Sequence, residues 1–169
     1  LVDPAKIEID LIEVNGVNCF GLANGRADVI ANGGTTANPL FNYLWSTSPL
    51  DSGPLAFNLP AGRHWVIAFV ALCVSDTLFF DVPTVQKIRL SNLTTFTNPA
   101  CFSSTDGSIT AFAQGGVDTL FRFNWLVNPP VSGNTISGLG AGTFYVRLID
   151  STGCFVIDSV TLTEPDSFA

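Results

Sequence analysis

Charged side chains are scarce in this sequence, and basic ones most of all. Charged residues make up 12% of its 169 residues, and seven Lys and Arg stand against 14 Asp and Glu. With a net charge of −7 the chain cannot neutralise a phosphate backbone, so we exclude nucleic acid as a partner. The acidic balance also argues against docking on an anionic lipid surface.

The sequence has no Met, no signal peptide and no apolar run of membrane-spanning length. Its longest purely apolar run is Trp65–Val74, ten residues, whereas a bilayer span needs about 20. We therefore expect no membrane insertion and interpret the run as a buried strand. The missing start residue and leader indicate a piece of a longer protein.

Side chains that carry chemistry are also few. One His is present, His64, and no Ser-His-Asp set, metal-ligand spacing or phosphate-binding glycine loop accompanies it. We expect no catalytic, cofactor-binding or metal-binding residue, no cofactor and no enzymatic activity. A cation site in the turn at Asp150 is an alternative that the pattern leaves open.

The sequence does contain one stretch that occurs twice. Residues 138–154 read GLGAGTFYVRLIDSTGC, and residues 58–73 read NLPAGRHWVIAFVALC. Each combines a glycine-containing turn, a strand rich in β-branched, aromatic and aliphatic residues, and a closing cysteine. A stretch that recurs in this way indicates that the chain is built from copies of one unit.

Equivalent positions recur across the rest of the chain. Cys19 and Cys101 are 82 positions apart, whereas Trp45 and Trp125 are 80 apart because the second copy has a shorter turn between them. Small length changes in turns are typical of tandem copies of one β domain. We predict two repeats, which occupy residues 1–84 and 85–169.

Each copy is predicted to be a series of short strands. Residues 121–127 place Phe121, Phe123 and Trp125 on one face, which is the period-two pattern of a half-buried strand. We expect Trp125 and its equivalent Trp45 to be core aromatics rather than ligand platforms. Further strands are predicted at residues 26–31, 41–45, 55–59, 63–72, 74–82, 108–113, 135–139, 143–149 and 155–163.

The strand pattern also predicts the fold class. About seven short strands in each copy, with no sustained helical periodicity, predict an all-β chain of two tandem immunoglobulin-like β-sandwich domains. The pairs Gly33-Gly34 and Gly115-Gly116 are interpreted as hairpin residues, since no helix follows them.

The four cysteines divide equally between the copies, as Cys19 with Cys73 and Cys101 with Cys154. Four cysteines allow three connectivities, and we favour disulfides within each copy because repeats should be chemically self-contained. Each bond would contribute on the order of 4 kcal/mol in the chain-entropy model. One difficulty is that Cys101 and Cys154 would lie at opposite ends of the sandwich unless residues 101–105 form an edge strand. The alternative is four buried free thiols.

One set of motifs in the second copy has a recognisable order. It comprises Cys101, Asp106-Gly107-Ser108, Gly115-Gly116, Phe123-Asn124-Trp125, Ile136–Leu139, Ala141–Val146, Asp150 and Gly153-Cys154. This set resembles the SprB repeat, which occurs in large surface adhesins of Bacteroidota, including the gliding-motility adhesin. The first copy is looser, because Asn24-Gly25-Arg26 replaces Asp-Gly-Ser and Val70–Leu72 replaces the turn before Cys73.

The resemblance implies a structural spacer in a secreted adhesin filament for gliding motility or attachment. Such a protein would be exported by type IX secretion and would be extracellular, on the outer membrane of a Gram-negative bacterium. Its partners would be neighbouring repeats of the same chain, and other domains would contact surface polysaccharide or the substratum. The triplets centred on Thr77, Thr119 and Ser159 look like acceptors of Bacteroidota O-glycosylation.

A second class of function is a carbohydrate-binding β-sandwich module of a secreted protein. Sugar rings bind on planar arrays of exposed aromatic side chains, and candidates for such an array are Phe20, Phe80, Phe102 and Phe168. The two classes differ in what they require, because a spacer needs no pocket and a binding module does.

Overall fold

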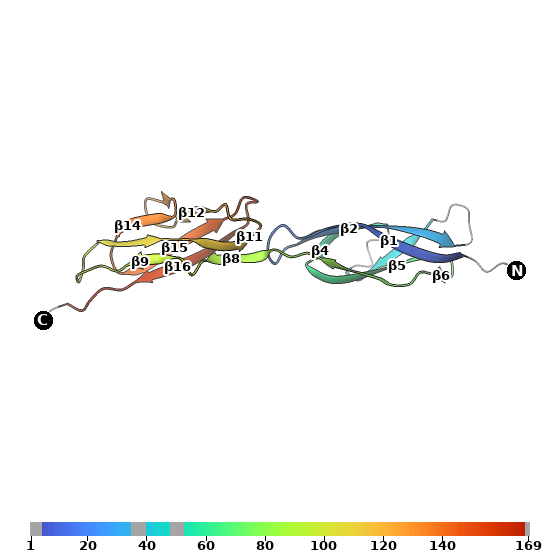
Figure 1. Ribbon diagram of the computed structural model, residues 1–169, viewed down its shortest axis with the longest axis horizontal. Helices are drawn as coiled ribbons and strands as arrows, with labels where there is room; N and C mark the ends of the chain where they lie inside the picture. Colours follow the sequence, from blue (N-terminus) through green and yellow to red (C-terminus); the bar gives the residue numbers. More distant parts are fainter. Residues whose placement is uncertain (1–4, 35–39, 48–52, 168–169) are drawn as a thin grey trace. The chain divides into compact units, whose positions relative to one another are not determined.

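The computed structural model describes residues 5–34, 40–47 and 53–167. Every regular element in these ranges is a β-strand, so the all-β class predicted from the sequence is confirmed (Figure 1). The chain divides into two compact units, Leu1–Val85 and Gln86–Ala169, here called unit 1 and unit 2. Each is described by itself.

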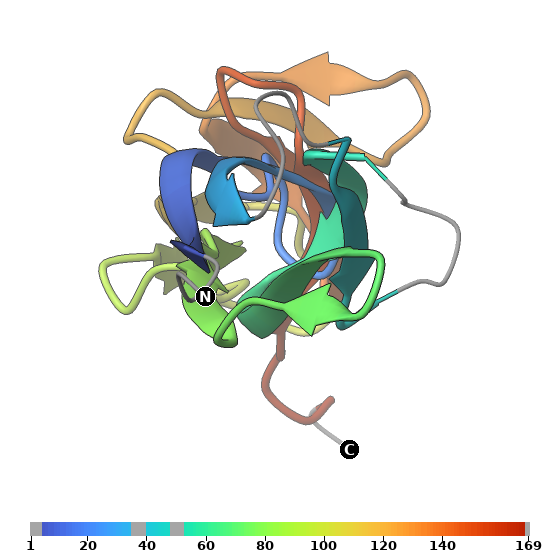
Figure 2. The same cartoon turned by 90° about the vertical axis from the view of Figure 1, so that its right-hand side faces the viewer.

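Unit 1 is a sandwich of two antiparallel sheets, coloured blue to green in Figure 2. Its strands are β1 (Ala5–Asn15), β2 (Ala23–Gly34), β3 (Asn42–Trp45), β4 (Leu55–Pro60), β5 (Gly62–Val70), β6 (Cys73–Val74) and β7 (Leu78–Val82). One sheet has the order β1-β2-β4, and the other has the order β3-β5-β6 with β7 also paired to β5. The strand β1 was not predicted from the sequence.

The core of unit 1 follows from alternation along its strands. On β5 the buried residues are His64, Val66 and Ala68, and the residues between them are half-buried. Trp45 packs its ring against Phe80 edge-on, with ring centroids 5.9 Å apart and planes at 87°. This T-shaped contact is a preferred geometry for aromatic pairs in a core.

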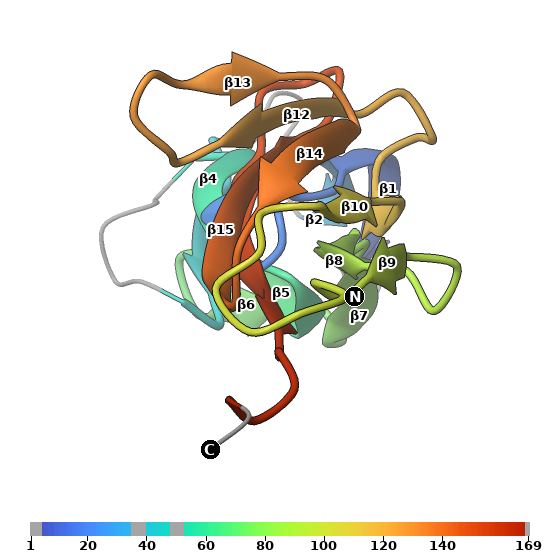
Figure 3. The ribbon, with the colours of Figure 1, turned by 90° about the vertical axis from the view of Figure 1, so that its left-hand side faces the viewer.

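Unit 2 repeats this architecture with more interruptions. Its strands are β8 (Gln86–Leu90), β9 (Thr95–Thr97), β10 (Gly107–Thr110), β11 (Ala113–Gly116), β12 (Arg122–Trp125), β13 (Val131–Ser132), β14 (Thr135–Leu139), β15 (Gly142–Ile149) and β16 (Phe155–Leu162). The sheet orders are β14-β10-β9, β11-β8 and β13-β12-β15-β16 (Figure 3). Antiparallel sheets of this kind, in two packed layers, form the immunoglobulin-like sandwich expected from the sequence.

The same tryptophan lies in the core of each unit. Trp125 is fully buried, and its indole Nε1–H donates to the carbonyl of Gly133 at 3.0 Å. Trp45 is 3% exposed, and its Nε1–H donates to the carbonyl of Gly53, also at 3.0 Å. A buried Trp keeps its one donor satisfied in this way. The two units therefore share not only their strand order but also this hydrogen bond.

Each unit has two distinguishable ends, one where the chain enters and one where it leaves. In unit 2, β8 begins at Gln86 beside Gly116, and we call this the entry end. The last strand, β16, finishes at Leu162 beside Gly142, and we call this the exit end. In unit 1, β1 begins beside Gly34 at the entry end, and β7 finishes at Val82 beside Gly62 at the exit end. The chain therefore enters and leaves each unit at opposite ends.

The two Gly pairs are the last residues of β2 and β11, and the strands that follow them, β3 and β12, belong to other sheets, so the hairpin interpretation is wrong. Gly33 in β2 has φ 97° and Gly115 in β11 has φ 89°, both in the left-handed region. A Cβ would lie 2.1 Å from the Lys6 carbonyl oxygen at Gly33, and 2.2 Å from that of Lys87 at Gly115. The neighbouring strand thus passes too close for any side chain, which period-two patterns do not reveal.

Replacing Gly115 by Ala should therefore destabilise unit 2. A non-Gly residue in this conformation costs about 1–3 kcal/mol, and the contact with a backbone oxygen adds to that loss. Gly140→Ala is the matched control, because its Cβ would meet no atom closer than 3.6 Å. Urea unfolding should show a lower midpoint for Gly115→Ala only, and equal midpoints for the two variants would contradict this account.

Candidate functional site

The chemistry-bearing side chains of the described residues do not form a reactive centre. No group of three or more His, Cys, Asp or Glu that could hold a metal ion occurs within residues 5–34, 40–47 and 53–167. Nor does that part of the chain contain a helix long and apolar enough to cross a membrane.

His64 is a structural residue of the unit 1 core. It is 6% exposed, and its Nε2 lies 2.9 Å from the Pro60 carbonyl, which can only accept a hydrogen bond. Nε2 therefore carries a proton, and Nδ1 lies 3.0 Å from the Ser46 hydroxyl. With both ring nitrogens engaged by protein groups, His64 is a structural residue of the core.

The cysteines lie at opposite ends of their own units. In unit 1, Cys19 precedes β2 at the exit end, and Cys73 pairs with Val70 at the entry end. In unit 2, Cys101 precedes β10 at the exit end, and Cys154 lies beside Asp150 at the entry end. Residues 101–105 form a turn and not an edge strand.

Pairing within each copy is therefore wrong. Cys73 is a half-buried free thiol and Cys101 is an exposed free thiol, whereas Cys19 and Cys154 are disulfide-bonded. The eight residues of β15 separate the two ends of unit 2 by about 23 Å at 3.3 Å per residue. A disulfide joins Cα atoms no more than about 7 Å apart, so the length of the strand excludes a bond within the unit.

Asp150 closes the entry end of unit 2. Its fully buried carboxylate accepts hydrogen bonds from the backbone N–H groups of Thr152 at 3.0 Å and Cys154 at 3.0 Å. The Thr152 hydroxyl donates at 2.8 Å, and the Val117 N–H donates to the second oxygen at 3.3 Å. Four donors occupy the oxygens that a cation would need, which argues against the calcium turn left open by the sequence.

These hydrogen bonds also set the charge state of Asp150. Burial acts to raise its pKa, but the donors from Thr152, Val117 and Cys154 outweigh burial and hold the pKa below its usual value. The group is therefore an ionised, buried carboxylate whose partners are all backbone amides or a hydroxyl. In unit 1 the equivalent position is Val70, and a two-residue turn with Ala71 at φ 51° replaces this arrangement.

A second carboxylate orders the cysteine turn at the exit end of unit 2. Asp106 accepts from the Ser104 hydroxyl and from the Ala100 N–H, and these bonds lower its pKa. In unit 1 the equivalent acceptor is the amide oxygen of Asn24, which binds the Asn18 N–H at 3.2 Å. The two cysteine turns are thus built alike around different side chains.

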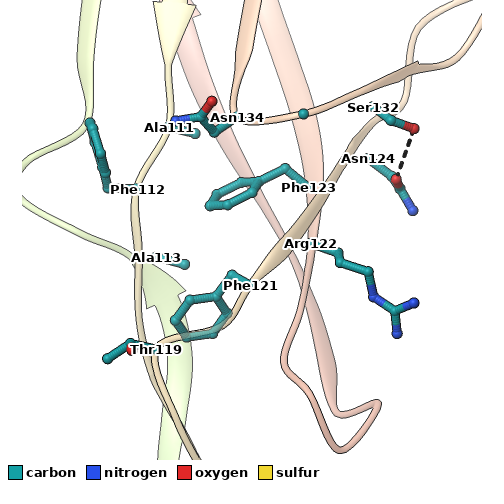
Figure 4. A pocket seen from close by; sticks show the side chains of 11 residues that line it. Ala111, Phe112, Ala113, Thr119, Phe121, Arg122, Phe123, Asn124, Ser132 and Asn134 are labelled. Atoms are coloured by element: carbon teal, nitrogen blue, oxygen red, sulfur yellow. Dashed lines mark hydrogen bonds between the residues drawn. The ribbon is translucent and has the colours of Figure 1, made fainter.

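Unit 2 has a groove with a volume of about 550 Å³. It is lined by the segment Ala111–Ala113, which connects β10 to β11, by Thr119 and residues 121–124 in and before β12, and by residues 132–134. Phe121 and Phe123 point across the groove toward Ala111 and Ala113, whereas Arg122 and Asn124 point to the other side (Figure 4). The groove is therefore apolar along its wall and polar at its rim.

The aromatic candidates for sugar binding separate into three cases. Phe20 and Phe102 are 56% and 53% exposed, and each follows the cysteine in the equivalent turn of its unit. Phe80 is only 5% exposed and packs on Trp45, so it is wrong as a surface candidate. Phe168 lies outside the described residues. The structure does not place Phe80 on any surface array, because the alternation of β7 turns it into the core.

The three O-glycosylation candidates have exposed side chains. Thr77 precedes β7, Thr119 lies in the turn before β12, and Ser159 lies on β16. Each could accept a glycan without disturbing a core, and modification at these positions stays a prediction.

Comparison with protein families confirms the resemblance seen in the sequence. The SprB repeat matches two segments of this chain, residues 12–50 and 93–126, with one segment in each unit. The matched segments run through the cysteine turn, the Gly pair and the core Trp of each copy. No curated protein matches the sequence.

Several solved structures resemble the chain at low similarity. One is the structure of Dpr11 IG1 bound to DIP-gamma IG+IG2, with 12% sequence identity, coverage of 93% of this chain and 98% of that chain, and a TM-score of 0.35. Another is DIP-gamma IG1+IG2, with 10% identity, coverage of 95% of this chain and 99% of that chain, and a TM-score of 0.36. A third is domains 4 and 5 of the S-layer protein SbsC, with 12% identity, coverage of 95% of this chain and 99% of that chain, and a TM-score of 0.34. At these TM-scores the likeness supports no functional conclusion.

Proposed function

Because this chain carries two SprB repeats in tandem, we propose that it is a structural repeat segment of a large secreted cell-surface adhesin. The SprB repeat is associated with cell-surface adhesins, which suggests an extracellular location. The segment acts as a spacer, which holds a distal adhesive part of the protein away from the cell. The filament serves gliding motility or attachment, is exported by type IX secretion, and belongs to the outer membrane of a Gram-negative member of the Bacteroidota.

One observation carries this proposal: the same sandwich occurs twice, and each copy has its own core and opposite entry and exit ends. Units that are entered at one end and left at the other can follow one another in a series of any length. In such a series, stability is a sum over repeats and each repeat adds length, which is what a spacer requires. The partners of each repeat are then its neighbours in the same chain.

The residues that form the site support a structural and not a catalytic role. Two of the buried ionisable groups, His64 and Asp150, have their polar atoms engaged by hydrogen bonds within their own unit. Neither has a free atom directed at a cavity where a substrate could react. We therefore propose that the chain has a mechanical role, as a spacer, and not a catalytic one.

Deletion of the two repeats from the parent adhesin tests the spacer role. Filaments imaged with antibodies on intact cells should shorten, and attachment to the substratum should persist because the adhesive part lies elsewhere. Replacement of the two repeats by two unrelated sandwich domains of equal length is the matched control and should restore filament length. Loss of attachment from filaments of restored length would contradict the spacer role.

The groove of unit 2 favours carbohydrate binding as a second candidate function. Its aromatic wall, with Phe121 and Phe123, and the amide of Asn134 beside it are of the kinds that bind a sugar face and its hydroxyls. Glycan-array binding by the intact chain should be lost in Phe121→Ser and retained in Phe96→Ser, an exposed residue of β9 outside the groove. Absence of any glycan signal from the intact chain would rule this function out.

A further inference from the structure

The free cysteines occupy positions that are bonded in the other repeat. Cys101 is equivalent to Cys19, because the Ser104 N–H donates to the Cys101 carbonyl at 3.1 Å and the Leu22 N–H donates to that of Cys19 at 3.2 Å. Cys19 is disulfide-bonded and Cys101 is a free, exposed thiol. The same turn therefore holds a bonded cysteine in one repeat and a thiol in the other.

The second pair of positions shows the same relation. Cys73 and Cys154 each follow the long strand of their unit, β5 or β15, at the entry end. Cys154 is disulfide-bonded and 8% exposed, whereas Cys73 is a half-buried free thiol. Each repeat thus has one cysteine at its entry end and one at its exit end, and in each repeat one of the two is a thiol.

The end at which the chain enters or leaves a unit determines which cysteine of a neighbouring repeat each thiol faces. A repeat that follows unit 2 in the same chain begins where unit 2 is left, at the exit end that carries Cys101. That repeat presents its own entry end, where a cysteine equivalent to Cys154 lies. By the same reasoning, a repeat that precedes unit 1 presents an exit-end cysteine to Cys73.

We propose that Cys101 and Cys73 are linkage sites, at which further repeats of the same kind attach through disulfides between an exit-end and an entry-end cysteine. The proposal rests on the spacer function, since it needs an array of repeats. A junction linked in this way has a disulfide in addition to the peptide chain. An unfolded repeat would then stay linked to each neighbour through a disulfide as well as through the peptide chain.

The chemistry of each linkage is ordinary disulfide exchange. The thiolate of one cysteine attacks a sulfur of an oxidant disulfide and forms a mixed disulfide. The second cysteine then attacks that bond, and the oxidant leaves as a dithiol that has taken up two electrons and two protons. The oxidant is a protein or small-molecule disulfide outside the chain. Exposure of Cys101 allows the first attack.

A chain of four repeats tests the proposal. Two copies are fused so that Pro165 of the first is followed by Ala5 of the second, which leaves three residues between strands, as Pro83–Val85 do here. After exposure to oxidised glutathione, thiol titration of the folded protein should find two thiols, because fusion brings Cys101 of the first copy next to Cys73 of the second. Peptide mapping should recover these two cysteines in one linked peptide.

Two variants identify the partners in the fused chain. Cys101→Ser in the first copy should raise the count to three thiols by leaving Cys73 of the second copy unpaired. Cys101→Ser in the second copy should lower the count to one. Four thiols in the unmodified fused chain, or a linked peptide that contains any other pair, would overturn the proposal. Such a result would leave the spacer function standing, since filament length does not depend on these bonds.

A second measurement uses the 169-residue chain and does not depend on the fusion. Isotope-labelled Cys73→Ser and unlabelled Cys101→Ser are mixed at high concentration with oxidised glutathione. Mass spectrometry should find the mixed dimer in large excess over both homodimers, because only that pair joins an exit end to an entry end. The statistical mixture expected from random thiol oxidation would overturn the proposal.

Discussion

Replacement of Trp125 by Ala should lower the free energy of unfolding of unit 2 by about 3–5 kcal/mol, the range for loss of a buried aromatic. The side chain is fully buried and its indole is bonded to the Gly133 carbonyl. Its removal leaves a cavity between the two layers of the sandwich and an unsatisfied carbonyl. A loss of this size approaches the whole stability of a domain of this length, so unit 2 should unfold at or near room temperature.

Hydrogen exchange of the intact chain measures this effect unit by unit. In Trp125→Ala, amides of β15 should lose protection while those of β5 keep it, because each unit has its own core. Trp45→Ala is the matched control and should give the reverse pattern. Trp65, which is only half-buried, should tolerate the same change in unit 1 at lower cost. Loss of protection in both units from either core variant would contradict the division into two sandwiches.

Replacement of Asp150 by Ala should destabilise unit 2 by about 1–3 kcal/mol, the cost of leaving a buried donor, here the Cys154 N–H, without its acceptor. Four donors lose their partner, among them the N–H groups of Thr152, Cys154 and Val117. Asp150→Asn keeps the volume and one acceptor oxygen and should show a smaller loss. Val70→Ala in unit 1 is the control for a change at the equivalent position.

The same carboxylate makes the stability of unit 2 depend on pH. Hydrogen bonding lowers the pKa of Asp150 in the folded state, so the unfolded state binds more protons near the usual carboxyl pKa of about 3.9. The stabilisation is therefore fully present above that value and is lost as the pH falls through the folded-state pKa. The free energy of unfolding, measured with denaturant at about pH 5 and about pH 3, should differ more between the two pH values for the wild type than for Asp150→Ala. Parallel pH dependence in the two proteins would show that Asp150 does not make this contribution.

Much of the fold could be predicted from the sequence because its strands alternate in period two. The strands around Trp45 and Trp125, and the long strands β5 and β15, lie where the pattern predicted them. Comparison of the two copies showed which positions of one repeat are equivalent to those of the other, because tandem copies repeat their turns as well as their strands. The strand β1 was not predicted, although apolar and charged residues alternate over Lys6–Leu11.

The cysteine pairing and the Gly pairs could not be predicted for a physical reason. Both depend on how far apart or how close segments lie in space, which local patterns do not contain. Symmetry between the copies favoured bonds inside each one, but the length of β15 separates Cys101 from Cys154. Position 115 requires glycine because the backbone of Lys87 passes so close that a Cβ would overlap with it, and not because the chain turns there.

The role of Asp150 was likewise predicted only in part from the sequence. The Asp-Ser-Thr-Gly sequence indicates a turn, and the residue pattern left a cation site open. The hydrogen bond from Val117 comes from a segment 33 positions away, and it engages the second carboxylate oxygen. A contact so distant in sequence has no local signature, and it changes the interpretation of Asp150 from a candidate ligand to a structural residue.

Thiol labelling of the folded, unreduced chain tests the central claim most directly, namely that each repeat is a sandwich whose two cysteines lie at opposite ends and are not bonded to each other. Iodoacetamide followed by peptide mapping should find Cys73 and Cys101 alkylated, and Cys19 and Cys154 labelled only after reduction. Peptides that join Cys19 to Cys73 and Cys101 to Cys154, with no thiol to label, would contradict the account.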